Sequence, residues 1–202
     1  MKTIESNILG TLKQAKGFDD WWESDPVAIS FFEDKKTTIT YMDVVPDNDP
    51  TFIEEADQAI KTFLSKERED RFDISALAYK NCMDFLRAVE FDEADQPLWD
   101  IEHENDIWKF IYPHDIYVTR GHGKDDGIYI NVACECEWEQ EHGFQMIFKR
   151  GNQLVKLSEQ DGYIAEEKET LNLHETSNTF DHKIPEEQHT TSIWSKFKRF
   201  WT

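Results

Sequence analysis

The sequence feature that most constrains the fold is a series of five short β-type segments between residues 107 and 157. Each segment is rich in β-branched or aromatic residues, and turns that contain glycine, asparagine or aspartate separate most of them. The segments are 107–112, 115–120, 127–138, 144–150 and 154–157. Consecutive short strands joined by tight turns usually pair with each other, so this stretch predicts an antiparallel β-sheet meander.

Two more β-type segments and two helical segments precede this stretch. In the helical segments apolar residues recur at three- and four-residue steps, which is the spacing of an amphipathic helix. The strands are expected at 27–33 and 37–45. The first helix has an apolar face that runs from Phe52 to Leu64, and the second helix covers about residues 72–89. Asp49 and Pro50 predict the N-cap and the first position of the first helix. We therefore expect an α+β fold, in which roughly six or seven antiparallel strands pack against two helices.

The charge balance indicates what kind of partner the protein binds. Among 202 residues, 42 are acidic and 22 are basic, which gives a formal net charge of −20. A field of that sign repels nucleic acid and anionic membranes, and it attracts basic proteins. Nucleic-acid binding is therefore disfavoured, and a basic protein is the expected partner. The alternative is that the acidity serves only to keep the protein soluble.

The compact domain is expected to span residues 1–165, because the sequence after it is polar and has no periodicity. Residues 166–191 are interpreted as a polar linker or tail, and residues 192–202 as a short amphipathic C-terminal helix. Its apolar face contains Ile193, Trp194, Phe197, Phe200 and Trp201. This face can dock on its own domain, on a partner or on a membrane surface. Docking on the domain is favoured, and a peripheral adaptor tethered by the helix is an alternative function.

The location of the protein is inferred from three features. Residues 1–17 contain no apolar signal-type segment, and no stretch approaches the roughly 20 apolar residues of a membrane-spanning helix. The chain has 3 cysteines, an odd number that does not indicate a disulfide framework. We therefore expect a cytoplasmic protein, and membrane association is disfavoured.

Cys134 and Cys136 lie on the same side of a predicted strand as several apolar residues, because side chains alternate along a strand. This pattern predicts that both cysteines are small core residues. Together with His142 they would make part of a zinc site, but a fourth ligand is lacking. We therefore expect no metal and no cofactor.

Glu139, Glu141 and His142 form the densest group of titratable residues. Two carboxylates beside an imidazole can serve as general acid and base, so a metal-dependent or acid/base hydrolase is one alternative function. Their order differs from the His-Glu-x-x-His of metalloproteases, and they fall on a turn that ends at Gly143. We favour a structural turn, and expect no catalytic residue and no enzymatic activity.

The same segment carries a resemblance to a known family. Its residues match a Cys-x-Trp-Glu-x-Glu-His-Gly signature at Cys136, Trp138, Glu139, Glu141, His142 and Gly143. Two apolar segments and Asp161-Gly162 follow, and this arrangement resembles a family of uncharacterised bacterial proteins over residues 112–162. The family has no assigned catalysis, and its small acidic members look like immunity proteins that protect against bacterial toxins. The resemblance implies a binding protein that neutralises a basic toxin or enzyme.

The residues expected to contact such a partner are acidic and aromatic. Trp21 and Trp22 are flanked by acids, and because adjacent residues of a strand point to opposite faces, one of them is expected on the surface. The full set is Trp21, Trp22, Glu135, Glu137, Glu139, Glu141, Trp194, Phe197 and Trp201. The charges would raise the association rate, and the aromatic contacts would set the residence time of the complex.

Overall fold

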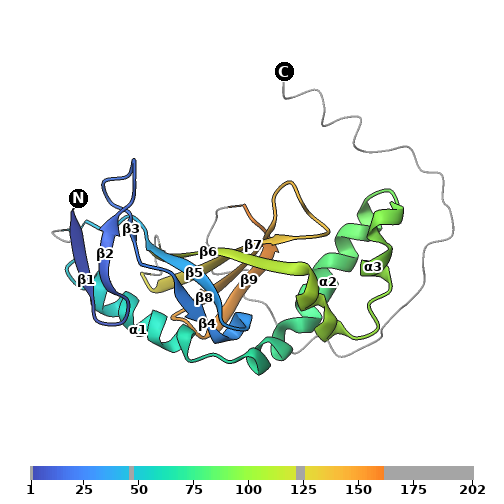
Figure 1. Ribbon diagram of the computed structural model, residues 1–202, viewed down its shortest axis with the longest axis horizontal. Helices are drawn as coiled ribbons and strands as arrows, with labels where there is room; N and C mark the ends of the chain where they lie inside the picture. The colour runs from blue at the N-terminus through green and yellow to red at the C-terminus, as the bar shows by residue number, and fades with distance from the viewer. Residues whose placement is uncertain (1, 46–47, 122–125, 162–202) are drawn as a thin grey trace, which may run out of the picture.

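The computed structural model describes residues 2–45, 48–121 and 126–161, and it confirms the α+β fold. Within these residues nine strands form a mostly antiparallel open sheet, in the order β1-β2-β3-β5-β6-β7-β8-β9 with β4 paired to β5 (Figure 1). The strands are β1 (Thr3–Ser6), β2 (Gly10–Gln14), β3 (Trp22–Glu23), β4 (Val27–Ile29), β5 (Lys35–Tyr41), β6 (Ile111–Arg120), β7 (Ile128–Cys136), β8 (Phe144–Lys149) and β9 (Gln153–Glu159). The helices are α1 (Phe52–Leu64), α2 (Phe72–Ala88) and α3 (Gln96–Trp99), with 3-10 turns at Ser30–Phe32, Arg68–Arg71, Glu93–Asp95 and Glu104–Phe110.

The predicted meander is present from β6 to β9, but β5 and β6 run parallel. Their register runs from Thr38 opposite Asp115 to Tyr41 opposite Val118. A parallel pair needs a long crossover connection, and α1 and α2 supply it. The two helices therefore connect two halves of one sheet.

The strand predicted at 107–112 is mostly helical in the structure. Residues up to Phe110 form a 3-10 helix that buries Ile107 and Trp108, and β6 begins at Ile111. β6 then continues as one strand through a register shift between Pro113 and Asp115. Proline has no N–H to donate to a strand ladder, so a bulge is the usual place for it inside a sheet.

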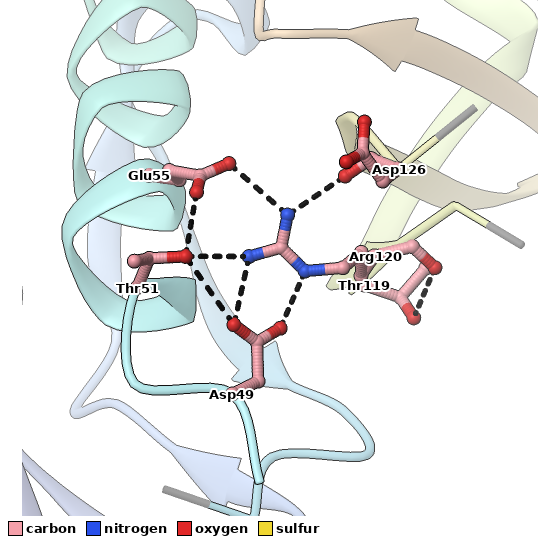
Figure 2. A network of polar contacts seen from close by, with 6 residues as sticks. All are labelled: Asp49, Thr51, Glu55, Thr119, Arg120 and Asp126. Carbon is pink, nitrogen blue, oxygen red and sulfur yellow. Dashed lines mark hydrogen bonds and ion pairs between the residues drawn. The ribbon is translucent and has the colours of Figure 1, made fainter. Parts of the chain in front are cut away.

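The start of α1 also differs from the prediction. The helix begins at Phe52, and Thr51 before it makes no side-chain capping hydrogen bond. Asp49 does not cap the helix because its carboxylate binds Arg120 at the end of β6, with an Nε–Oδ2 distance of 2.5 Å and an Nη2–Oδ1 distance of 3.1 Å (Figure 2). Arg120 also donates to Glu55 Oε2 at 3.0 Å and to the Asp126 carbonyl oxygen at 2.7 Å. This guanidinium therefore ties α1 and the segment before it to the sheet.

A buried carboxylate holds the N-terminal hairpin against the same helix. Asp57 of α1 is 5% exposed and accepts hydrogen bonds from the Ser6 hydroxyl at 2.5 Å, the Asn7 N–H at 2.6 Å and the Tyr41 hydroxyl at 2.8 Å. Each donor comes from a different position, at the end of β1, in the following turn and in β5. β1 and β2 were not predicted from the sequence.

The core lies between the two long helices and one face of the sheet. It contains alternate strand residues such as Ile116 and Val118 of β6 and Val132 of β7, together with residues of α1 and α2. Gly151, in the turn between β8 and β9, approaches α1 so closely that a Cβ atom there would lie 2.1 Å from the Ala59 carbonyl oxygen. The opposite side of the sheet, called here the outer face, carries the remaining strand positions.

Candidate functional site

The outer face of β6 and β7 is where the predicted acidic residues meet surface aromatic residues. The strand register places Tyr112 opposite Glu135, Asp115 opposite Ala133, and Tyr117 opposite Asn131. These positions alternate with the core residues of the same two strands, so they face away from α1 and α2. The bulge at Pro113 preserves this arrangement, because it brings Tyr112 to the same face as Tyr117.

An aromatic group occupies the β3 side of this face. Phe18 stacks on Trp21 with ring centroids 4.1 Å apart, and Trp21 lies 6.2 Å from Tyr117. Phe18 is 47% exposed, and Trp21 and Tyr117 are half-buried. Trp22 points the other way: it is 5% exposed, and its indole N–H donates to the Val44 carbonyl oxygen at 3.2 Å. Of the tryptophan pair, therefore, Trp21 is on the surface and Trp22 is in the core.

Carboxylates surround this aromatic group. Glu23 and Tyr117 occupy the same row of the sheet, because each is opposite Thr40. Burial raises the pKa of Tyr117, and the negative charge of Asp115, a hydrogen bond with Asp115 and the negative charge of Glu23 raise it further. Lys13, the cross-strand neighbour of Glu23, is held by Asp25 at 2.6 Å.

Beyond Tyr112 the outer face continues into an acidic hollow of about 470 Å³. Tyr112 is 40% exposed and donates a hydrogen bond from its hydroxyl group to Glu137. This hydrogen bond raises the pKa of Tyr112, and burial raises it further. The residues that line the hollow are Tyr112, His114, Cys134, Glu135, Cys136, Glu137, Glu139, Gln140, Glu141, His142, Gly143 and Gln160, with no lysine or arginine among them.

The turn between β7 and β8 has a structural explanation. Glu139 accepts the backbone N–H groups of Glu141 at 3.1 Å and His142 at 3.2 Å, and its carbonyl oxygen accepts the N–H of Gly143 at 2.9 Å. Gly143 has φ 72°, and a Cβ atom there would lie 2.7 Å from the Cys134 carbonyl oxygen. Trp138, the tryptophan of the signature, donates from its indole N–H to Asn81 of α2 at 3.1 Å. These signature residues therefore shape the turn and fasten it to the helix layer.

Two residues of the same turn form, together with Glu159 of β9, a group that has the donor atoms of a metal site. Ligand atoms of Glu139, His142 and Glu159 lie within 4.8 Å of one another, and His142 Nδ1 is 3.4 Å from Glu139 Oε1. Glu141, which the sequence analysis grouped with Glu139 and His142, is not a member of this set. Glu139 Oε1 is already the acceptor of two backbone N–H groups, so its position is explained by the turn.

Cys134 and Cys136 are buried as predicted, with exposed fractions of 0% and 4%. Burial raises the pKa of both thiols, that of Cys136 to about 12, so both remain protonated at neutral pH. Both cysteines act as core residues.

Three of the predicted contact residues, Trp194, Phe197 and Trp201, lie outside the described residues. Conversely, Phe18, Tyr112, Asp115 and Tyr117 belong to the acidic and aromatic surface but were not predicted. Strand alternation along β6 contained the signal for Asp115 and Tyr117. Phe18 lies before β3, and the bulge at Pro113 hides the face of Tyr112 from the sequence pattern. Within the part of the chain that the structure describes, no helix has the length and apolar character needed to cross a membrane.

Comparison with known proteins gives one match. A family model described as a domain of unknown function (DUF6985) covers residues 8–164. No curated protein and no solved structure matches the chain. The match supports the resemblance to an uncharacterised domain family, and its description assigns no activity.

Proposed function

The chain belongs to the DUF6985 family, a domain of unknown function, and on that premise we propose that it is a non-catalytic binding protein for a basic protein partner. The binding surface is the outer-face patch, defined as Phe18, Trp21, Glu23, Tyr112, Asp115, Tyr117, Glu135 and Glu137. The patch joins the aromatic group at Trp21 to the acidic hollow beside Tyr112 across β6 and β7.

The observation that carries this proposal is the combination of half-exposed aromatic rings and carboxylates on one sheet face. Aromatic side chains provide a large contact area with little loss of conformational entropy, and they dominate the binding energy of many interfaces. Carboxylates beside them attract arginine and lysine, and a guanidinium can stack on Tyr112 or Trp21 while it binds an acid. A net charge of −20 extends this attraction beyond contact distance.

The partner class that fits best is a basic toxin or enzyme that the protein neutralises, as in an immunity protein of bacteria. Two properties support this class: the strong acid excess of the chain and the absence of a lysine or arginine among the residues lining the hollow. A basic active site that binds nucleic acid would be covered by such a surface, because its own ligand is also anionic.

The test is the association kinetics of the purified complex. The partner is isolated with the full chain as bait, identified, purified, and mixed with the protein in a stopped-flow instrument at low and high salt. We expect the association rate to fall steeply with salt, because exposed charges are screened beyond about 8 Å at physiological ionic strength. An association rate that does not depend on salt would contradict the electrostatic part of the proposal.

Matched variants locate the surface. Trp21→Ala should raise the dissociation rate by about 10-fold or more, which is the effect of removing an aromatic hot spot. Glu135→Gln should mainly lower the association rate. Phe91, which is 50% exposed in the loop after α2, and the exposed Glu102 provide the controls Phe91→Ala and Glu102→Gln. If the controls weaken the complex as much as the patch variants do, the partner binds elsewhere.

A further inference from the structure

We infer that the C-terminal segment of this chain, residues 192–202, docks on the outer-face patch and competes there with the partner. The inference concerns the regulation of the proposed surface, so its link to the partner rests on the proposed function. The docking itself is a property of this chain alone. The chemistry of the patch, the sequence of the segment and the length of chain between them support it.

The segment has the chemistry that the patch would bind. Its apolar residues, Ile193, Trp194, Phe197, Phe200 and Trp201, recur at helical spacing, and Lys196, Lys198 and Arg199 occupy the other positions. Five large apolar side chains on one short face would leave an exposed patch that proteins usually cover. The segment is also cationic, unlike the chain as a whole, whose net charge is −20.

The outer-face patch is complementary to the segment both in its apolar surface and in its charge. Phe18, Trp21 and Tyr117 offer aromatic surface, and Glu23 and Asp115 lie beside them. The acidic hollow follows on the same face, next to Tyr112. Aromatic rings of the segment can therefore pack against rings of the patch while its lysines and arginine reach carboxylates. The inward face of the sheet is not available, because α1 and α2 fill it.

The connection between the two is long enough. The described chain ends at Asp161, just after β9, and β6 lies three strands away in the order β6-β7-β8-β9. With about 4.8 Å between neighbouring strands, that distance is roughly 14 Å. Residues 162–191 provide a connection that can span up to about 100 Å when extended. A tethered segment needs only weak intrinsic affinity, because the second binding event is intramolecular.

The experiment uses the full chain with a single new thiol, Ser192→Cys, that carries a nitroxide spin label. The three native cysteines are 0% to 4% exposed, so the label reacts at the new position. Amide signals of a ¹⁵N-labelled sample are compared before and after reduction of the nitroxide. We expect the strongest broadening at the outer-face residues of β6 and β7, among them Asp115, Tyr117 and Glu135. Amides on the far side of α1 should be the least affected.

Two controls make the result specific. The same labelled chain with Phe197→Ser and Trp201→Ser should lose most of the broadening. In the labelled chain that keeps Phe197 and Trp201, high salt should reduce the broadening. A mixture is also measured, in which one chain carries the spin label but no ¹⁵N and the other carries ¹⁵N but no spin label. Broadening in this mixture would show that a second copy occupies the patch. The inference would also be overturned if the broadening were centred on another surface, or if it were no stronger than in the double variant. Broadening that appears only when anionic vesicles are added would overturn it as well.

Partner binding separates this inference from the proposed function. If the segment competes, Phe197→Ser with Trp201→Ser should raise the association rate with the partner several-fold. If the spin label reports no docking while Tyr117→Ala still weakens the complex, the inference is wrong and the proposed function stands. If the segment docks on the patch but Tyr117→Ala leaves the complex unchanged, the proposed binding surface is wrong and the docking stands.

Discussion

At the scale of single residues, Asp57 shows how a buried carboxylate can hold an element in place without a cation. The Ser6 hydroxyl, the Asn7 N–H and the Tyr41 hydroxyl that donate to it are neutral groups, and burial and the hydrogen bond to Asp57 both raise the pKa of Tyr41. Tyr41→Phe removes one donor from this buried group, and we expect a loss of about 1–2 kcal/mol of unfolding free energy. Tyr112→Phe is the matched control, because it removes an exposed hydrogen bond to Glu137 and should cost less than about 0.5 kcal/mol. Urea unfolding of the two variants measures the difference, and equal losses would contradict it.

Gly151 and Gly17 allow two effects of a glycine to be separated. Both have positive φ, 81° and 93°, but only Gly151 faces a neighbour, since its added Cβ would lie 2.1 Å from the Ala59 carbonyl oxygen. Gly17→Ala should cost about 1 kcal/mol of unfolding free energy from backbone strain alone. Gly151→Ala should cost more than about 3 kcal/mol, because the turn must also move away from α1. Thermal unfolding compares them, and a similar loss in both variants would show that the turn does not press on the helix.

At the scale of elements, Arg120 makes the attachment of α1 dependent on pH. The hydrogen bond from Arg120 lowers the pKa of Glu55 below its ordinary value of 4.5, with a second contribution from Thr51. A carboxylate with a lowered pKa in the folded state stabilises the protein above about pH 4.5, and that stabilisation disappears as the pH falls through the lowered value. We therefore expect the stability of the parent protein to fall more steeply below pH 4.5 than that of Glu55→Gln. Parallel acid-unfolding curves would contradict this expectation.

The elements also show which parts of the fold the sequence can predict. The apolar repeats of α1 and α2 are long and helical in spacing, so both helices were found, although α1 begins two residues after the start predicted at Pro50. β1 and β2 are short and mostly polar, and tertiary contacts such as those of Asp57 hold them in place. The bulge at Pro113 breaks the local alternation of β6, so the face of Tyr112 could not be read from spacing. Contacts between distant segments therefore decided the β1–β2 hairpin, and a local bulge decided the face of Tyr112.

At the scale of the whole molecule, the candidate surface combines a part that sequence could predict with a part that it could not. The acids of residues 135–141 were found because they are close together in the sequence. Phe18, Trp21 and Tyr117 come from separate segments, and the sheet order β3-β5-β6 brings them together. The parallel pairing of β5 with β6 is the reason, since it places the loop before β3 beside the middle of β6.

The charge of the hollow leads to a prediction about stability and function together. Four glutamates line the hollow without a lysine or arginine, so in the free protein they repel one another. Residues kept for binding commonly lower stability in this way. The double variant Glu135→Gln with Glu141→Gln should therefore be more stable than the parent at low salt, by less than about 1 kcal/mol, and the gain should vanish at high salt. Glu102→Gln is the control, and its stability should change little.

Thermal unfolding at both salt concentrations measures the change in stability. The double variant should also slow association with the partner. If neutralising these acids destabilises the protein at low salt, they serve the fold of the turn and not a binding surface.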